Sequence, residues 1–235
     1  FGLLPSDPRC KLCASPFKGW GGALMRLMGR EQSRYNPRFC LKCEPFEHPG
    51  GAEVVITMFF ADVRGSTRLA EQMSAREFRS LMDRFYRLGS HVLINSDAMV
   101  DRLLGDEVVG LYAPGMAGKE HPRRAVEAAR QLLELTGHRD RGGPWLPVGI
   151  GVHTGPAYVG IVGGSAGEPQ DFTALGDNVN ITARLASLAG PGEILISEAA
   201  YEAAGLGAHD LESRQLDLKG KSGPTAVRVM RVSPA

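Results

Sequence analysis

The chain has 235 residues, of which 43% are hydrophobic and 23% are charged, a composition and length that suit a soluble protein with one full domain and a small accessory module. Its 27 basic and 26 acidic residues leave a net charge of +1, which excludes a global field that favours nucleic acid or an anionic membrane. The longest apolar stretch, at residues 54–61, is far shorter than the roughly 20 residues of a membrane helix. We therefore expect a cytoplasmic chain with no membrane span.

All four cysteines lie in the first 43 residues, in two Cys-x₂-Cys pairs: Cys10 with Cys13, and Cys40 with Cys43. Two such pairs in a cytosolic chain indicate a tetrahedral thiolate site, and Zn²⁺ is its commonest occupant. We predict one Zn²⁺ per chain, with an iron–sulfur cluster as the less favoured alternative. A segment this small has little core of its own, so the metal would hold it folded. It has no evident aromatic platform for stacking bases, so no nucleic-acid partner is expected.

A cluster of chain-breaking residues at 48–51, His-Pro-Gly-Gly, predicts two domains, 1–50 and 51–235. In the second domain strands and helices alternate, while hairpins make the sheet mixed and mostly antiparallel, which predicts an α+β fold with helices packed on the sheet. The expected elements, in chain order, are a strand at 53–62, a short helix capped by Ser66 or Thr67 and ending near Met73, a helix from a Ser74–Glu77 capping box to about 93, a hairpin at 97–112, a helix at 122–135, strands at 146–153 and 157–162, a glycine-rich loop at 163–169, a strand near Phe172, a helix at 177–189, a strand at 193–197, a short helix capped by Ser197, and strands at 214–219 and 225–232.

Two aspartates stand where strands end or turn. Asp62 closes a strand rich in Val, Ile and Phe and leads into a helix, so it lies beside free backbone N–H groups and the positive end of the helix dipole. Asp106 lies in the turn of a hairpin that can pack beside this strand. Two hard oxygen ligands at one spot suit Mg²⁺ or Mn²⁺, which keep substrate phosphate among their ligands. Taken singly, each aspartate is more typical of an exposed turn.

Four segments, in this order and spacing, resemble the catalytic domain of the class III nucleotidyl cyclases, the adenylyl and guanylyl cyclases. The resemblance covers about residues 52–232 and implies a ferredoxin-like palm. It also implies a homodimer, arranged head to tail, with its active sites between the subunits. The four segments are FFADVRGSTRLAE at 59–71, RLLGDEVVGLY at 102–112, GVHTGPAYVGIVG at 151–163 and DFTALGDNVNITARL at 171–185.

The resemblance implies roles for individual residues. Asp62 and Asp106 match the two metal-binding aspartates, with the backbone carbonyl of Val63 as a further ligand, for two Mg²⁺ or Mn²⁺ ions per active site. Asn180 would orient the ribose and Arg184 would stabilise charge on the α-phosphate, and their i, i+4 spacing places both on one helix face. The other implied contacts are the backbone amides of Gly65, Ser66 and Thr67 with the triphosphate, and either Lys219 or Lys221 with a phosphate.

Arg102 and Thr173 stand where adenylyl cyclases usually have Lys and either Asp or Thr as contacts to the base. Arginine only donates and can reach N1 of adenine, while the threonine hydroxyl can accept from N6. Guanylyl cyclases usually place an acid at the position of Arg102, so ATP is favoured as the substrate. Because arginine can also donate to O6 of guanine, GTP stays open.

The expected function is a nucleotidyl cyclase that converts ATP to 3′,5′-cyclic AMP and pyrophosphate by two-metal catalysis at a homodimer interface. The alternatives are a guanylyl cyclase that uses GTP and a catalytically silent domain that binds nucleotide for regulation. A diguanylate cyclase is disfavoured because Leu104 stands where the turn of that family needs a glycine. His153, at the end of a packed strand, is expected to be structural.

Overall fold

The computed structural model describes residues 7–43, 51–163, 170–207, 211–218 and 223–234. None of the helices in these ranges has the length and apolar composition needed to cross a membrane. The elements are α1 (Gly19–Leu27), η1 (Leu41–Cys43), β1 (Gly51–Val63), α2 (Ser66–Gln72), α3 (Ala75–Asn95), β2 (Met99–Leu104), β3 (Glu107–Tyr112), α4 (Pro114–Ala117), α5 (His121–Leu135), β4 (Val148–Gly163), β5 (Gln170–Leu175), α6 (Asp177–Leu188), β6 (Glu193–Ser197), α7 (Glu198–Ala203), β7 (Glu212–Leu216) and β8 (Thr225–Arg231).

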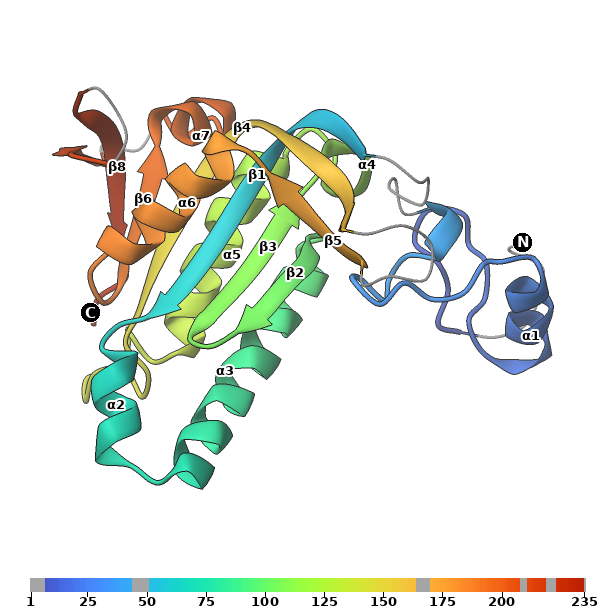
Figure 1. Ribbon diagram of the computed structural model, residues 1–235, viewed down its shortest axis with the longest axis horizontal. Helices are drawn as coiled ribbons and strands as arrows, with labels where there is room; N and C mark the ends of the chain where they lie inside the picture. The colour runs from blue at the N-terminus through green and yellow to red at the C-terminus, as the bar shows by residue number, and fades with distance from the viewer. Residues whose placement is uncertain (1–6, 44–50, 164–169, 208–210, 219–222, 235) are drawn as a thin grey trace.

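The strands form one eight-stranded sheet in the order β2-β3-β1-β4-β6-β8-β7, with β5 paired to β4 (Figure 1). All pairs are antiparallel except β4 with β6, which is parallel. The predicted α+β fold, with a mixed and mostly antiparallel sheet and helices packed on it, is thereby confirmed.

Strand β1 runs through the middle of the sheet and is buried on both faces. Phe59 and Ala61 point to one face and join the core formed with α3 and α5, while Met58 and Phe60 point to the other face and join the core under β5. Figure 1 shows α3 and α5 behind the sheet and α6 and β5 in front of it. Burial of alternate side chains on opposite faces explains why this strand is almost continuously apolar.

The two helices after β1 begin differently. The capping box predicted for α3 is present: the Ser74 hydroxyl accepts from the Glu77 N–H at 3.3 Å, and the Glu77 carboxylate accepts from the Ser74 N–H at 2.8 Å. The cap predicted for α2 is wrong, because its N-cap is Gly65, and no side chain in the described part of the chain caps the helix. Ser66 begins that helix, and its hydroxyl donates to the carboxylate of Asp106 instead. The Ser66 side chain therefore makes a tertiary hydrogen bond and is not available to cap the helix.

The strands predicted at 146–153 and 157–162 are one continuous strand, β4. Residues 154–156 stay extended because they pair with residues 55–57 of β1. Gly149 and Gly151 let α6 lie directly against β4, since a Cβ on either glycine would meet backbone atoms of residues 186–189 at 2.5 Å. This close approach fixes α6, and the side chains that it carries, relative to the sheet.

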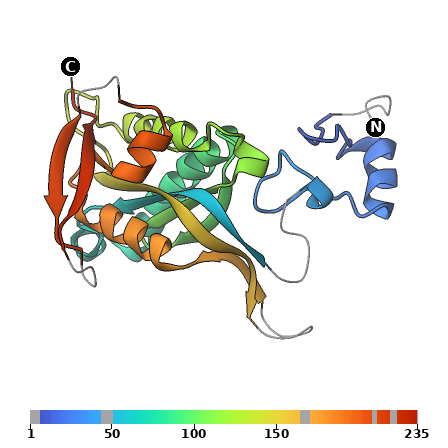
Figure 2. The same cartoon turned by 90° about the horizontal axis from the view of Figure 1, so that it is seen from above.

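The cysteine-bearing segment packs at one end of the sheet (Figure 2). The N–H of Val100 in β2 donates to the carbonyl of Tyr35 at 3.1 Å, and the amide of Asn36 donates to the carbonyl of Ala98 at 2.7 Å. The Tyr35 ring also lies 5.1 Å from the ring of Phe172 in β5. The segment is therefore attached to β2 and β5, while the boundary predicted at residue 50 lies outside the described residues.

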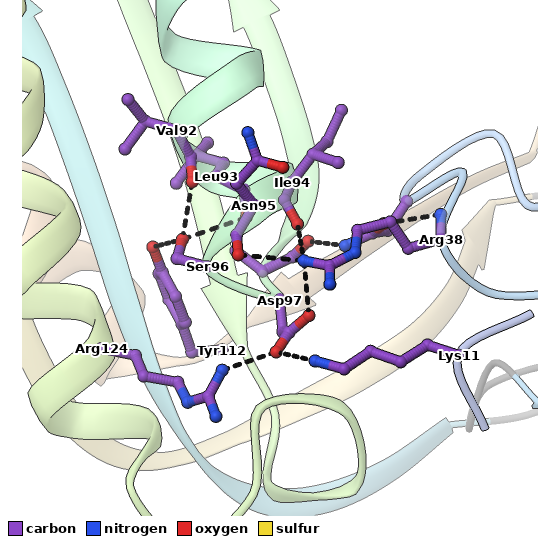
Figure 3. A network of polar contacts seen from close by, with 12 residues as sticks. Lys11, Arg38, Val92, Leu93, Ile94, Asn95, Ser96, Asp97, Tyr112 and Arg124 are labelled. Atoms are coloured by element: carbon purple, nitrogen blue, oxygen red, sulfur yellow. Dashed lines mark hydrogen bonds and ion pairs between the residues drawn. The ribbon is translucent and has the colours of Figure 1, made fainter.

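Asp97 strengthens this attachment from the turn between α3 and β2. Its φ of +68° places it in the left-handed position of a Schellman motif, where glycine is usual. Its carboxylate is 1% exposed and pairs with Lys11 and Arg124 at 2.5 Å and with Arg38 at 3.1 Å (Figure 3). The contact with Arg38 has ion-pair distance without hydrogen-bond geometry. Lys11 lies within the first cysteine pair, Arg38 lies two residues before the second, and Arg124 lies on α5, so one buried carboxylate joins both parts of the chain.

The substitution Asp97→Asn is expected to lower the free energy of unfolding by about 1–3 kcal/mol, because three cations lose their shared counter-charge. The loss should be smaller than for a fully buried pair because the three cations are 37–41% exposed. Asparagine tolerates the left-handed conformation, so the change isolates charge. Urea unfolding measures the loss in the free energy of unfolding. The control is Asp83→Asn, which breaks an exposed ion pair with Arg79. Equal losses in the two variants would contradict the role of Asp97.

Candidate functional site

The end of β1 and the β2–β3 turn meet at one corner of the sheet. Asp62 lies directly opposite Glu107 of β3 in the antiparallel register. The N–H of Val63 donates to the carbonyl of Asp106 at 3.1 Å, and the Ser66 hydroxyl donates to the Asp106 carboxylate. The structure therefore brings together the two aspartates that the sequence analysis selected from distant positions.

Arg64 places positive charge beside these carboxylates. Its guanidinium pairs with Asp62 and donates to the carbonyl of Ser187 at 2.6 Å. Burial lowers the pKa of Arg64, while the charges of Asp106 and Glu107 raise it. Burial and the neighbouring Asp106 charge raise the pKa of Glu107. Three carboxylates thus share a half-buried corner with one arginine, which favours the binding of further positive charge.

The donor set at this corner fits a hard divalent cation. The carboxylates of Asp62 and Asp106 and the backbone carbonyl of Val63 offer the oxygen ligands that Mg²⁺ and Mn²⁺ prefer. Both aspartates are partly exposed, Asp62 by 18% of its side chain, so water and phosphate oxygens can reach them. These residues can therefore hold the metal ions that the sequence predicts.

The start of α2 offers backbone N–H groups next to the carboxylates, because the first N–H groups of a helix have no acceptor within it. Gly65 has a φ of +70°, and no atom lies within 4 Å of the point where a Cβ would stand, so its backbone is open. Thr67 is exposed, whereas the Ser66 side chain is held by Asp106. The predicted triphosphate contacts therefore lie beside the predicted metal ligands.

Arg102 and Thr173 lie on strands that are not neighbours in the sheet. Arg102 is exposed on β2, just after a register shift, and Thr173 is buried on β5. Strand β5 pairs with the last residues of β4 and crosses in front of the sheet (Figure 1), and the Thr173 hydroxyl donates to the carboxylate of Asp101 at 3.3 Å. Thr173 therefore contacts the residue directly before Arg102, which brings the two segments that carry the predicted base contacts together.

Asn180 and Arg184 lie one turn apart on α6, with Asn180 exposed and Arg184 half-buried. Among the residues that the structure describes, neither has a hydrogen bond or ion pair to Asp62 or Asp106. Direct contacts therefore do not join these two residues of α6 to the two aspartates within the described part of one chain. Lys219 and Lys221 lie outside the described residues.

His153 is 8% exposed, and its ring nitrogens lie 2.7 Å from the Ser197 hydroxyl and 2.8 Å from the side-chain oxygen of Asn178. It joins β4 to the start of α6 and to the cap of α7, which agrees with the structural role expected of it. Sequence reasoning missed Arg64 and Asp101. Arg64 stands inside the FFADVRGSTRLAE segment, and Asp101 is an acid in a strand whose other residues are apolar apart from Arg102, so the sequence carries a signal for both.

The sulfur atoms of the four cysteines all lie within 4.8 Å of one another. The Sγ atoms of Cys13 and Cys40 are 3.7 Å apart, close to the ~3.8 Å expected around a tetrahedral Zn²⁺ with Zn–S bonds of ~2.3 Å. Although burial opposes ionisation, hydrogen bonds with Ser15 and the neighbouring thiols lower the pKa of Cys13 to about 6. The N–H of Cys40 also donates to the Sγ of Cys10 at 3.3 Å. This donor set fits a thiophilic metal ion.

Known proteins match most of the chain. The family profile described as the adenylate and guanylate cyclase catalytic domain matches residues 52–230. Adenylate cyclase 1 of Rhizobium meliloti is 32% identical over 135 residues, which cover 55% of this chain and 20% of that protein. Guanylate cyclase 2G of Mus musculus is 30% identical over 176 residues, which cover 72% of this chain and 16% of that protein. The chain thus spans a fifth or less of the length of these relatives.

Two solved structures show the same fold. The guanylyl cyclase Cya2 superposes with a TM-score of 0.68 at 25% identity, covering 79% of this chain and 96% of that one. The adenylyl cyclase CyaB from P. aeruginosa superposes with a TM-score of 0.66 at 26% identity, covering 80% of this chain and 97% of that one. The resemblance read from the four sequence segments is thereby confirmed. This chain belongs to the adenylate and guanylate cyclase catalytic-domain family.

Proposed function

We propose that this chain is an adenylate cyclase that converts ATP to 3′,5′-cyclic AMP and pyrophosphate. The observation that carries the proposal is the convergence of Asp62, Asp106 and the start of α2, which places candidate metal ligands beside candidate phosphate contacts. Membership of the cyclase family supplies the class of reaction. Arg102 and Thr173 support adenine as the base, because they offer a donor and an acceptor.

In the proposed reaction the ribose 3′-oxygen attacks the α-phosphorus in line, the 3′-hydroxyl gives up its proton to solvent, and the bond between the α-phosphorus and the bridging oxygen breaks to release pyrophosphate. Asp62, Asp106 and the carbonyl of Val63 would hold two Mg²⁺ or Mn²⁺ ions, which lower the pKa of the attacking hydroxyl and neutralise phosphate charge. The backbone amides of Gly65 to Thr67 would orient the triphosphate at the start of α2.

Asn180 and Arg184 complete the proposed site. Asn180 would hold the ribose so that its 3′-oxygen faces the α-phosphorus, which removes orientational freedom before the reaction. Arg184 would donate to the α-phosphate oxygens as negative charge develops on them. Because neither contacts Asp62 or Asp106 within one chain, we assign them to the site formed with the metal ligands of a second subunit.

Exposed apolar side chains support such an interface. Val55, Tyr158 and Leu175 are 52%, 37% and 50% exposed. Tyr158 pairs with Leu175 across β4 and β5, and Val55 pairs with Pro156 two residues earlier on β4, so the three lie close together. Grouped apolar surface of this kind is typical of protein interfaces. We assign it to a second copy of the chain in a head-to-tail homodimer.

A guanylate cyclase is the second candidate, because the Arg102 guanidinium can also donate to O6 of guanine. A silent nucleotide-binding domain is less favoured, because Asp62, Asp106, Asn180 and Arg184 are all present. We also propose one Zn²⁺ in the cysteine site, supported by the spacing of its sulfur atoms.

The purified chain, incubated with Mn²⁺ and ATP, is expected to release cyclic AMP and pyrophosphate, identified by chromatography. Asp62→Ala should reduce the rate by about 10²–10³-fold, because a group that stabilises transition-state charge through the metals is lost. Asp83→Ala, an exposed change on α3, is the control and should keep the rate of the unchanged protein. Cyclic GMP formed from GTP in preference to cyclic AMP would favour the second candidate. A dimer that makes neither product would favour the silent domain.

Mixing two inactive variants tests the shared site. Asp106→Ala and Arg184→Ala are each expected to be inactive alone, yet a mixed dimer has one site in which both residues are intact. After exchange of subunits, the mixture should recover about a quarter of the normal activity. Mixing Asp106→Ala with Asp62→Ala is the matched control, because both changes damage the same half of the site and no site is restored. Equal activity in the two mixtures would contradict the shared-site arrangement.

Metal analysis of the purified chain should give about one zinc per chain. The double substitution Cys13→Ser and Cys40→Ser should abolish the bound zinc, whereas Ser15→Ala, beside Cys13, should keep it. Iron with visible absorbance would contradict the assignment of zinc.

A further inference from the structure

Asp101 lies on β2 and is largely buried, and its carboxylate accepts a hydrogen bond from the hydroxyl of Thr173 at 3.3 Å. Its Oδ2 accepts this bond, while its Oδ1 is buried and has no hydrogen-bond partner among the residues that the structure describes. Burying a carboxylate oxygen without a partner costs free energy, so such an atom in a native protein calls for an explanation. Neither the packing of the sheet nor the roles assigned above require a carboxylate here.

The backbone places Asp101 for contact with β5. The pairing of β2 with β3 shifts register between Val100 and Arg102, so Asp101 is the residue left out of the ladder. Such a bulge redirects the side chain that it carries. Thr173 is 6% exposed on β5, which folds over the sheet and brings its hydroxyl to the carboxylate. The contact therefore links the two predicted base-contacting positions, 102 and 173.

The chemistry of this pair removes an ambiguity. A threonine hydroxyl has one hydrogen to donate and lone pairs that accept, so alone it suits either purine. An ionised carboxylate only accepts, so the Thr173 hydrogen is committed to Asp101 and only the lone pairs remain for a ligand. At ring position 6, adenine carries an amino group that donates and guanine a carbonyl that accepts.

We propose that Asp101 is a positioning residue that selects adenine, because it holds the Thr173 hydroxyl as an acceptor for the 6-amino group. This inference rests on the proposed function and adds the residue that makes its site prefer ATP to GTP. Arg102, which only donates, complements N1 of adenine in the same pair. A guanine at this place would set its carbonyl against lone pairs of Thr173, and its N1–H against the donors of Arg102.

The protonation state of Asp101 should also make the preference for ATP depend on pH. Burial raises the pKa of Asp101 to about 6, although the Thr173 bond and the charge of Arg102 oppose the increase and Asp171 adds to it. Asp101 lines a groove of about 360 Å³, and the other charged or titratable residues that line it are Arg34 and Tyr35. Above pH 7 the carboxylate only accepts. Below pH 6 the protonated carboxyl can donate to Thr173, which frees the hydroxyl hydrogen, so the preference for ATP should weaken.

The test compares ATP with GTP, as the ratio of kcat/KM and as the ratio of dissociation constants, at pH 8 and pH 5.5. The ratio cancels the titration that the two triphosphates share. Asp101→Asn keeps the shape, but its amide can donate to Thr173, so the preference for ATP should fall about tenfold and lose its dependence on pH. Thr173→Val should lower the preference for ATP by a similar factor, and Thr173→Ser, which keeps the hydroxyl, should retain that preference. Asp171→Asn removes a nearby exposed carboxylate that does not contact Thr173, and should leave the ratio at pH 8 unchanged.

Adding Asp101→Asn to Thr173→Val should cause no further fall in the ratio, because Asp101 acts through the hydroxyl that valine lacks. The proposal would be overturned if Asp101→Asn lowered kcat/KM equally for ATP and GTP, so that their ratio did not change. A further fall of the ratio in the double variant would also overturn it. If Asp101→Asn does not fold, a pH-independent ratio in the unchanged protein would overturn it. If the unchanged protein forms neither cyclic nucleotide, the proposed function fails, while the ratio of dissociation constants still decides the role of Asp101.

Discussion

The register of β1 between β3 and β4 is the constraint on which the rest of the structure depends. This strand is hydrogen-bonded along both edges and buried on both faces, so a slip of one residue would exchange its two buried faces. The same register sets Asp62 opposite Glu107 and the N–H of Val63 against the carbonyl of Asp106. The register that packs the core therefore also places the candidate metal ligands.

The β2–β3 hairpin extends this constraint from the metal corner to the candidate base contacts. Its turn carries Asp106, and its first strand carries Asp101 and Arg102. The same strand starts beside Asp97, whose buried carboxylate gathers Lys11, Arg38 and Arg124. The cysteine segment is thus anchored to the strand that bears Arg102, one of the two candidate base contacts, so the folding of that segment and the geometry of the candidate nucleotide site are physically linked.

Local sequence patterns correctly predicted the helices and strands that are determined by interactions between residues close together in the chain. The Ser74–Glu77 capping box and the apolar spacing of α3 correctly predicted that helix, and alternation around Gly105 predicted the hairpin. Predictions failed where tertiary contacts decide. Ser66 serves Asp106 rather than the cap of α2, and β4 stays continuous because β1 pairs with it throughout. The contacts of Asp97 and Asp101 join segments far apart in the chain, which no local window contains. Motif resemblance selected Asp62 and Asp106, and only the sheet register explains their proximity.

The central claim is that the metal ligands of one subunit and the base contacts of another form one site. Anomalous diffraction from crystals grown with Mn²⁺ and a non-reactive ATP analogue tests it most directly. The account predicts manganese between the carboxylates of Asp62 and Asp106 in one subunit, with the adenine against Thr173 of the second. Manganese bound away from both aspartates, or a nucleotide held entirely by one subunit, would contradict it.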